Sequence, residues 1–261
     1  GNKFYEKWLD QTMTYSSAIF DQKNKNLPDA QLNKYKKIAE SLSLNENSKT
    51  LEIGCGWGGF SSFVAKEYKC KIDAITISKE QYNYTANKIQ KEGLGEKVEV
   101  QFKDYREINT KYSKIASIEM FEAVGKKYWK NYFDIIQKSL SENGKAALQI
   151  ITINEKRAED YQRRPDFIQQ YIFPGGMLPT KKQLDYTAKE VGLKFLELIS
   201  FGKSYAKTLN IWNSQFQDSW GDVSTIGFDS RFKRMWEFYF SYCETGFLSG
   251  STDVSHFLIK K

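Results

Sequence analysis

Short apolar runs alternate with helix-like patterns along residues 50–153. The apolar runs predict five strands, the first ending at Ile53 and the others covering 71–76, 98–102, 115–118 and 146–153. Between them, apolar residues recur every three or four positions and predict helices, as Phe60, Val64 and Tyr68 do. Because strands that alternate with helices of this length form a parallel sheet covered on both faces, we expect an α/β fold.

The remaining parts of the chain extend this pattern. Residues 32–42 predict a helix ahead of the first strand, and the apolar residues between 4 and 20 are expected to pack over the core as a lid. Residues 193–201 and 254–259 predict a terminal antiparallel hairpin, which brings the mostly parallel sheet to seven strands. The stretch 205–247 is markedly aromatic, which fits either helix packing or the wall of a channel for an apolar substrate.

A glycine-rich loop joins the first strand to the next helix. Glycines at 54, 56 and 59 fit the dinucleotide spacing G-x-G-x-x-G. Glycines at 54, 56 and 58 after Glu52 equally fit the E-x-G-x-G-x-G arrangement of S-adenosylmethionine (SAM) methyltransferases. A dinucleotide site expects an acidic residue at the tip of the second strand, where this chain has Thr76. The glycines therefore favour a nucleotide-like ligand, and the case for NAD is the weaker one.

Ligands of such sheets bind at the carboxyl ends of the strands. The segments expected at that edge are 54–58, 76–81, 104–105, 119–125 and 149–152. The helix that follows the glycine loop also offers free N–H donors and partial positive charge at its N-terminus, which suit a carboxylate or a phosphate. We therefore expect the functional site at this edge.

Composition narrows the class of partner. The chain of 261 residues is 40% hydrophobic and 15% aromatic, enough for a sizeable core in one domain, and its net charge is +7 with a pI near 9.0. The excess of basic residues favours an anionic partner, either nucleic acid or an anionic membrane surface. No apolar run approaches the ~20 residues that a membrane span needs.

Cysteine and histidine content argues against several kinds of site. The three cysteines, at 55, 70 and 243, fit neither a disulfide framework nor a zinc site and favour a reducing cytoplasm. With His256 as the single histidine, the sequence argues against a histidine-based metal centre and a Ser-His-Asp triad, and no metal is expected. His256 falls in an alternating strand pattern and is expected to be structural or exposed.

Eight collinear stretches of the chain resemble one enzyme family. They are 13–18 (MTYSSA), 52–60 (EIGCGWGGF), 76–81 (TISKEQ), 104–106 (DYR), 117–125 (SIEMFEAVG), 171–176 (YIFPGG), 205–209 (YAKTL) and 231–235 (RFKRM). The chain resembles the cyclopropane-fatty-acid synthase family, which includes bacterial and plant cyclopropane synthases and mycolic acid methyltransferases. Larger members of that family have an upstream domain that this chain lacks. Because the sequence opens in the middle of a pattern at residues 1–5, we expect a further part ahead of residue 1.

The resemblance implies a class I SAM-methyltransferase fold of the Rossmann-like type in a single catalytic domain. Its parts would be an N-terminal helical lid (1–45), a SAM-binding core (46–153), a helical insertion (154–192), and a C-terminal hairpin with aromatic substrate-channel helices (193–261). The implied activity is SAM-dependent transfer of a methylene or methyl unit to the double bond of an unsaturated fatty acyl chain. The implied substrate is a membrane phospholipid and the implied product a cyclopropane ring.

The resemblance also places eight residues around SAM. They are Tyr15 and Ser16 from the lid, Gly54 and Gly56 from the glycine loop, Thr76 and Gln81, and Asp104 and Tyr105 near the adenine. Ser78 and Gln81 have the spacing of a capping box, so Gln81 has a structural role to fill as well.

The implied reaction makes physical demands on the site. Methyl transfer to an alkene leaves a carbocation, so the site must exclude water, and aromatic faces can stabilise the positive charge without attacking it. A base must then remove one proton. In the family a bound bicarbonate serves as that base, held by a Cys, a Glu, a His, a backbone amide and a Tyr. The matching positions here are Ser17, Glu122, Gln149, the amide of Ile151 and Tyr205.

Two of these positions depart from the family pattern, since Ser17 and Gln149 stand in place of Cys and His. Both can still donate hydrogen bonds to an anion, but Gln cannot accept a proton as His can. Without bicarbonate, Glu122 is the base that the sequence predicts, with its pKa raised by apolar surroundings.

Other functions fit part of the pattern. The same first step with a different ending would give a methyl- or methylene-branched chain. Three other functions each explain less of the sequence: a small-molecule N- or O-methyltransferase, a domain that binds SAM or lipid without catalysis, and an NAD enzyme. We expect unsaturated phospholipid acyl chains and a transient anionic membrane surface as partners, no nucleic acid, and a cytoplasmic location at the inner face of the membrane. A homodimer is left open.

Overall fold

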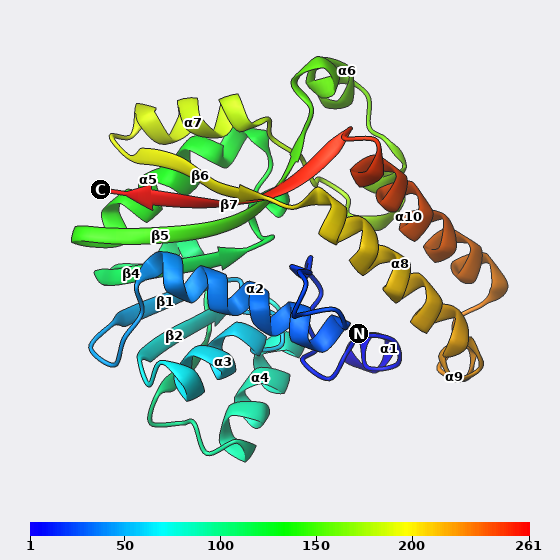
Figure 1. Ribbon diagram of the computed structural model, residues 1–261, viewed down its shortest axis with the longest axis horizontal. Coiled ribbons are helices and arrows are strands. Elements are labelled where there is room, and N and C mark those ends of the chain that lie inside the picture. Colours follow the sequence, from blue (N-terminus) through cyan, green and yellow to red (C-terminus); the bar gives the residue numbers. More distant parts are fainter.

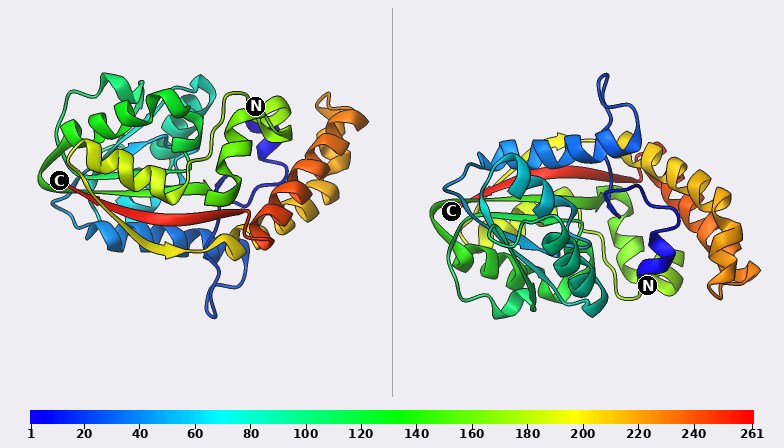
Figure 2. Two further views of the ribbon diagram at one scale, coloured as in Figure 1. Left: turned by 90° about the horizontal axis from the view of Figure 1, so that it is seen from above. Right: turned by 90° about the horizontal axis from the view of Figure 1, so that it is seen from below.

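The sheet of the protein has seven strands in the order β3-β2-β1-β4-β5-β7-β6, with helices on both faces (Figure 1 and Figure 2). The computed structural model describes all of residues 1–261. Strands β1 to β5 run parallel, and β7 is antiparallel to both of its neighbours, β5 and β6. This arrangement confirms the predicted α/β fold with a terminal antiparallel pair of strands.

Every predicted strand is present, although three of them (β4, β5 and β7) begin earlier than expected. The strands are β1 (Lys49–Ile53), β2 (Lys71–Thr76), β3 (Val98–Phe102), β4 (Tyr112–Ile118), β5 (Leu140–Ile153), β6 (Lys194–Ser200) and β7 (Thr252–Lys260). Residues 141–145 have the composition of a polar turn, but β5 runs through them with Asn143 in the left-handed region at φ +61°. The alternation predicted for the last strand is wrong, because residues 254–259 of β7 are all buried between two covered faces.

Helices cover the two faces of the sheet in separate groups. α2 (Leu27–Leu42), α3 (Gly59–Glu67) and α4 (Lys79–Lys91) pack their apolar sides on one face. α5 (Trp129–Ser139) and α7 (Lys181–Glu190) pack on the other. The remaining helices are α1 (Asn2–Tyr5), α6 (Ala158–Arg163), α8 (Gly202–Asp218), α9 (Trp220–Thr225) and α10 (Ser230–Leu248). Single turns are η1 (Tyr105–Glu107), η2 (Phe121–Ala123), η3 (Lys126–Tyr128), η4 (Glu155–Arg157) and η5 (Ile168–Ile172).

The first helix on the sheet, α2, begins ahead of its predicted start at residue 32. The Asn26 side chain accepts a hydrogen bond from the Asp29 N–H at 2.9 Å, and Pro28 lies in the first turn. Proline has a helical φ and no N–H to leave unpaired, so it fits that turn. The helix start is therefore set by its cap, which the apolar periodicity does not reveal.

The predicted capping box of α4 is only half formed. The Ser78 hydroxyl accepts a hydrogen bond from the Gln81 N–H at 3.3 Å, but the Gln81 side chain accepts from the Thr76 hydroxyl at 2.8 Å. A complete capping box occurs instead at α7, between Thr180 and Gln183. Gln81 is therefore held toward the end of β2 and not toward its own helix cap.

The N-terminal segment packs as predicted but is mostly not helical. Phe4 and Trp8 are buried in the largest apolar cluster, where the Phe4 ring lies 4.8 Å from Trp236 and the Trp8 ring 5.9 Å from Trp212. Only α1 is helical between residues 1 and 26, and the rest of this segment is extended chain and turns. The segment therefore owes its position to packing against α8 and α10.

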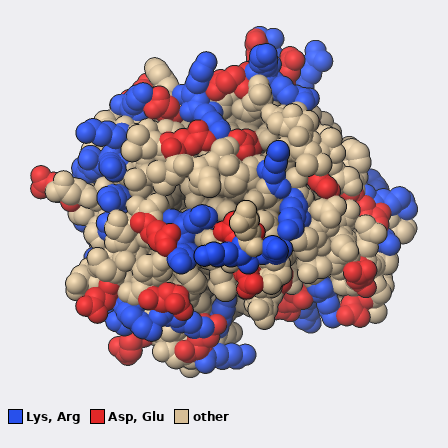
Figure 3. All heavy atoms as spheres, viewed as in Figure 1, with Lys and Arg blue, Asp and Glu red and all other residues tan.

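Charged residues cover the surface with both signs interspersed. In the view of Figure 3, Lys and Arg side chains gather across the middle of the face with acidic side chains among them. Several of the basic residues are in exposed ion pairs within one helix, such as Lys130 with Asp134 and Lys189 with Asp185. None of the helices is both long and apolar enough to cross a membrane.

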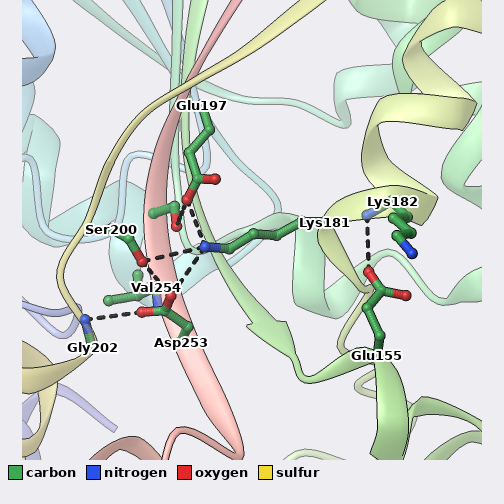
Figure 4. Close-up of polar contacts among 9 residues, drawn as sticks. Glu155, Lys181, Lys182, Glu197, Ser200, Gly202, Asp253 and Val254 are labelled. Carbon is green, nitrogen blue, oxygen red and sulfur yellow. Dashed lines mark hydrogen bonds and ion pairs between the residues drawn. The ribbon is translucent and has the colours of Figure 1, made fainter.

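Helices α8, α9 and α10 are inserted between β6 and β7 and project from the end of the sheet (Figure 1). Asp253 fixes the point where they leave it (Figure 4). Its carboxylate accepts hydrogen bonds from the Gly202 N–H at 3.0 Å and from the Lys181 ammonium at 3.1 Å, and it also pairs with the Ser200 hydroxyl. A carboxylate at the N-terminus of α8 complements the free N–H groups there, which anchors the insertion to the sheet.

Candidate active site

The glycine turn (Gly54–Gly58) leaves the end of β1 in a conformation that needs glycine. Gly54, Gly56 and Gly58 have φ values of +81°, +53° and +75°, all in the left-handed region. The N–H groups of Gly54 and Cys55 both donate to the carbonyl of Ile75 at 3.0 Å, which ties the turn to the end of β2. The turn is therefore a fixed feature of the carboxyl edge of the sheet.

The glycines of this turn serve two different purposes. A Cβ at Gly58 would lie 2.5 Å from the Thr85 side chain, so that position is needed for packing. A Cβ at Gly56 would meet nothing within 4 Å. Gly56 therefore faces open space just ahead of α3, where a ligand can approach the backbone closely.

The other predicted SAM residues lie at the ends of the neighbouring strands. Thr76 ends β2 and is hydrogen-bonded to Gln81, so the structure brings these two together. Asp104 and Tyr105 follow β3, but the Asp104 carboxylate is paired with the Arg106 guanidinium at 2.6 Å, which lowers its pKa. A ligand would have to share Asp104 with that arginine.

Tyr15 and Ser16 reach this edge from the N-terminal segment. The Tyr15 hydroxyl donates to the Tyr239 hydroxyl at 2.8 Å, and the Ser16 hydroxyl accepts from the buried Lys34 ammonium at 2.7 Å. Burial lowers the pKa of Lys34 to about 7. Because Ser16 only accepts in this pair, its own O–H remains free to donate to a ligand.

A cavity of about 1110 Å³ lies at the same edge. This exceeds the ~300–1,000 Å³ of ordinary small-molecule sites. Hydrophobic residues make up 17 of the 33 that line it, and its rings are those of Tyr15, Tyr161, Phe173, Tyr205, Phe238, Tyr239, Tyr242 and Phe247. The exposed residues Lys156, Arg157 and Arg164 also line it and form the cavity rim. The aromatic stretch predicted from the sequence therefore supplies both core packing and cavity wall.

Glu122 faces this cavity from η2, just beyond the end of β4. Its Oε1 accepts a hydrogen bond from the Ile151 N–H at 2.6 Å, and its Oε2 is buried without any hydrogen-bond partner. Burial and the nearby charge of Glu119 raise the pKa of Glu122 to about 8. Glu122 and the Ile151 amide, both expected to hold a bicarbonate, are thus bonded directly to each other.

A second carboxylate, that of Glu119, receives the other predicted donors. Its Oε1 accepts from the Ser17 N–H at 2.8 Å and from Gln149 Nε2 at 2.7 Å, and its Oε2 accepts from the Tyr205 hydroxyl at 2.7 Å. The Ser17 hydroxyl itself turns away and donates to the Ala18 carbonyl. We call the Ser17 N–H, Gln149 Nε2 and the Tyr205 hydroxyl the donor group. The structure brings its members together around Glu119.

Comparison with known proteins identifies the chain. A sequence family described as mycolic acid cyclopropane synthetase matches residues 1–257. This chain belongs to that family. The match covers the stretches that carry the resemblance seen in the sequence and confirms it.

Two curated relatives of this mycolic acid cyclopropane synthetase family member show the range of named activities. The chain is 35% identical over 261 residues to the tuberculostearic acid methyltransferase UfaA1 of Mycobacterium tuberculosis, covering 97% of this chain and 61% of the relative. It is 34% identical over 247 residues to the cyclopropane-fatty-acyl-phospholipid synthase of Escherichia coli K12, covering 95% and 62%. The chain therefore spans about three fifths of the length of these relatives.

Solved structures of the same family have the same fold. The mycolic acid cyclopropane synthase CmaA1, complexed with SAH and CTAB, superposes with a TM-score of 0.93 at 25% identity and covers 100% of this chain and 94% of its own. The cyclopropane synthase MmaA2 from Mycobacterium tuberculosis superposes with a TM-score of 0.92 at 26% identity, with the same coverage. These likenesses confirm the class I SAM-methyltransferase fold.

The bicarbonate implied by the resemblance does not fit the side chains of this family member. An anion needs free donors, and the N–H and O–H groups expected to hold it at residues 17, 149, 151 and 205 are already bonded to carboxylates of the chain. The donor group is bonded to Glu119, and the Ile151 N–H is bonded to Glu122. A bicarbonate placed here would lie against the Glu119 carboxylate, which already holds the donor group, so no step of the reaction is derived through it.

Glu119 is the site residue that the sequence did not single out. It was placed only among the residues at the edge of the sheet, because the family pattern draws attention to Glu122. Two signals point to it: it directly follows a buried strand, and it lies one helical turn ahead of Glu122. His256 was expected to be structural or exposed, and the structure buries it with its Nε2 2.9 Å from Gln149 Oε1.

Proposed function

We propose that the protein transfers the methyl carbon of SAM to the double bond of an unsaturated fatty acyl chain of a membrane phospholipid. The preferred outcome is a cyclopropane ring. The single observation that carries the proposal is the position of Glu119 and Glu122, which face a large ring-lined cavity at the edge that holds the glycine turn. An acyl chain needs such a cavity, and a carbocation needs its aromatic walls.

SAM fits the edge of the sheet in its polar features. The open space at Gly56 and the N-terminus of α3 suit the carboxylate end of the molecule, with Gly54 beside it. The ring of Tyr15 lines the cavity, and the neighbouring Ser16 has a hydroxyl that can donate to a ligand. Thr76, Gln81, Asp104 and Tyr105 complete the proposed set at the ends of β2 and β3. When bound, SAM supplies an electrophilic methyl group.

The side chains of this pocket hold the acyl chain and keep water away. Tyr205 stacks on Phe247 with ring centres 4.4 Å apart, and Tyr15 lies 5.1 Å from Trp212, which fixes both tyrosines at the cavity wall. A double bond held against these faces reacts in line with the methyl group, and the positive charge that develops lies beside aromatic rings. Four carboxylates line the cavity, those of Glu119, Glu122, Asp160 and Asp166, and Glu119 and Glu122 are the two that follow directly on β4.

The cavity rim supports a membrane lipid as the source of the chain. Lys156, Arg157 and Arg164 are exposed there and can pair with lipid phosphates. Phe238 and Tyr242 line the same cavity and are 52% and 41% exposed. Basic and apolar groups together suit transient binding to an anionic membrane surface at the cytoplasmic side. A homodimer is not needed for this site, since all of the residues named come from one chain.

The second candidate is the same methyl transfer with a methyl- or methylene-branched product. It is favoured by the 35% identity to a relative named for tuberculostearic acid methylation. A small-molecule N- or O-methyltransferase is less well supported, because it leaves the size of the cavity without a purpose.

One labelling experiment separates these outcomes. The protein is incubated with SAM that carries a trideuterated methyl group and with vesicles of an unsaturated phospholipid. Mass spectrometry and NMR of the released fatty acids then show whether a cyclopropane carbon with two deuterium atoms forms, as the proposal expects. A branched product would support the second candidate. Formation of S-adenosylhomocysteine only with small amines or alcohols, and never with lipid, would refute both.

A further inference from the structure

The carboxylate of Glu119 is held as an anionic ligand is held in a binding site. Three donors from three separate parts of the chain converge on it: the Ser17 N–H, Gln149 Nε2 and the Tyr205 hydroxyl, all at 2.7–2.8 Å. Two of these residues, Ser17 and Gln149, are fully buried, and Tyr205 is 6% exposed. Three buried donors that converge on one carboxylate stabilise its ionised form, as they would stabilise a bound anion.

The backbone of Glu119 has a conformation that costs energy. Its φ is +50°, in the left-handed region that glycine adopts easily and glutamate does not. Its N–H donates to the Gln149 carbonyl at 2.8 Å, which holds the residue in that conformation. Strained residues of this kind collect at functional sites, where the surrounding structure enforces them. A glycine would be the easier choice here unless the side chain is required.

Glu119 and Glu122 differ in the hydrogen bonds that their carboxylates receive. Burial raises the pKa of Glu119, and hydrogen bonds from the donor group and the charge of Lys34 oppose that rise. Glu122 has one donor only, and burial with the charge of Glu119 raises its pKa to about 8. Near neutral pH, Glu122 is therefore the neutral member of the pair, whereas three hydrogen bonds favour the ionised form of Glu119, and such a difference in surroundings is how sites separate acid from base.

We propose that Glu119 is the built-in general base of this protein and takes the place of a bound bicarbonate. The inference rests on the proposed function. It differs from the sequence-based expectation, in which Glu122 or bicarbonate removes the proton. The donor group, which would otherwise hold a free anion, holds a carboxylate that belongs to the chain.

The proposed step balances as follows. Once the methyl carbon is bonded to one alkene carbon and the sulfonium C–S bond has broken, the other alkene carbon is a cation. A C–H bond of the new methyl group breaks, and its electron pair forms the C–C bond that closes the ring. The proton goes to the Glu119 carboxylate, whose Oε2 has a lone pair beyond the one that accepts from Tyr205. Loss of a chain proton in the same way would give an alkene.

The wild-type protein gives the first test. Turnover is measured with SAM and unsaturated phospholipid vesicles in decarbonated buffer, with and without added bicarbonate. We expect the rate to change less than about twofold, because the base is part of the chain. A rate that collapses on removal of bicarbonate and returns with it would overturn the inference and leave the proposed function intact. Wild-type protein with no lipid turnover under either condition would instead refute the proposed function.

Two substitutions at one position give the second test. Glu119→Gly removes the carboxylate, relieves the left-handed strain and leaves the donor group free. Loss of a general base costs about 10²- to 10⁴-fold in rate, and we expect a loss of that size in decarbonated buffer. Added bicarbonate or formate should raise the rate of Glu119→Gly at least tenfold, since either anion can occupy the place that the carboxylate leaves. Glu119→Gln fills the same space with an amide. Its rate should fall by as much as that of Glu119→Gly, and added bicarbonate or formate should not restore it.

Control measurements separate this role from a structural one. Lys69, at φ +57° on an exposed turn far from the cavity, gives the matched variant Lys69→Gly, which should retain wild-type turnover. SAM binding by calorimetry should persist in both Glu119 variants. Unchanged turnover of Glu119→Gly in decarbonated buffer would overturn the inference. If Glu119→Gly does not fold, Glu119→Gln and the wild-type bicarbonate series decide between the two bases.

Discussion

The imidazole of His256 holds the side-chain amide of Gln149 in one orientation. Gln149 Nε2 donates to the Glu119 carboxylate at 2.7 Å, so its Oε1 must face His256 Nε2, 2.9 Å away. A carboxylate only accepts hydrogen bonds, and the amide oxygen only accepts as well. His256 therefore carries its proton on Nε2, and burial keeps it neutral by lowering its pKa to about 3.

Removal of the Nε2–H of His256 should weaken the hydrogen bond from Gln149 to Glu119, although His256 does not contact Glu119 itself. His256→Phe keeps an aromatic ring against Phe201, whose centre lies 4.9 Å from the imidazole, but leaves Gln149 Oε1 buried and unpaired. We expect a loss of about 1–3 kcal/mol in the free energy of unfolding by urea titration, with a fall in turnover. His256→Gln can still donate and serves as the control. Equal stability of His256→Phe and wild type would contradict this account.

The pH dependence of stability should report the raised pKa of Glu122. Its pKa rises from an ordinary value near 4.5 to about 8 on folding, so the folded state binds more protons between those values. Its contribution is therefore present at low pH and lost as pH rises from about 4.5 to about 8. The free energy of unfolding should fall by at most about 1.4 kcal/mol per pH unit in this range because of Glu122.

Glu122→Gln isolates that contribution, because the amide oxygen can still accept from the Ile151 N–H. Urea unfolding of wild type and variant is compared at several pH values. The difference in unfolding free energy should change steadily in favour of the variant between pH 4.5 and 8. Glu52, whose pKa burial also raises to about 8, is unchanged in both proteins and cancels from the difference. A difference that does not vary with pH would show that Glu122 is not held neutral.

The sequence predicted the architecture because that information is local. Apolar periodicity defines the strands, and the glycines at 54, 56 and 58 are required by their positive φ values. Helix α2 shows the limit of that approach, since its start depends on the Asn26 cap and Pro28 and not on periodicity. Element types were therefore predicted well and element starts less so.

The site was predicted less completely because its key contacts join distant residues. Glu119 bonds to Ser17 and Tyr205, which are 102 and 86 positions away. A resemblance to a family can place Tyr205 and Glu122 but says nothing of where a neighbouring side chain points. Only the folded geometry shows that the donors expected around bicarbonate are bonded to Glu119 and Glu122.

Two glycine substitutions should separate folding from ligand binding. Gly58→Ala would place a Cβ 2.5 Å from Thr85 at φ +75°, so we expect a large loss of stability by urea unfolding, about 2–4 kcal/mol. Gly56→Ala meets no atom within 4 Å and should lose only about 1–2 kcal/mol from its positive φ. Its Cβ projects into the space assigned to SAM, so calorimetry should show at least tenfold weaker SAM binding. Wild-type SAM affinity in Gly56→Ala would place the ligand elsewhere.

The cavity rim should determine binding to anionic membranes. Each basic group near such a surface contributes about 1 kcal/mol, so reversal of Lys156, Arg157 and Arg164 to Glu should weaken binding to anionic vesicles by well over tenfold. The expected effect is electrostatic and should shrink as salt is added, since screening shortens the range of each charge. Sedimentation with vesicles of anionic or neutral lipid at several salt concentrations measures it.

A matched triple variant tests whether position or net charge is responsible. Lys69 precedes β2, Lys71 begins β2 and Lys91 ends α4. All three are exposed, form no ion pair and lie away from the cavity. Their reversal to Glu changes the net charge by the same amount as reversal at the rim. If binding depends on the rim, this control should lose much less affinity and keep its turnover on vesicles, whereas the rim variant should lose turnover on vesicles but retain SAM binding. Equal losses in the two triple variants would mean that overall charge brings the protein to the membrane, and the cavity mouth would then have no special part in lipid capture.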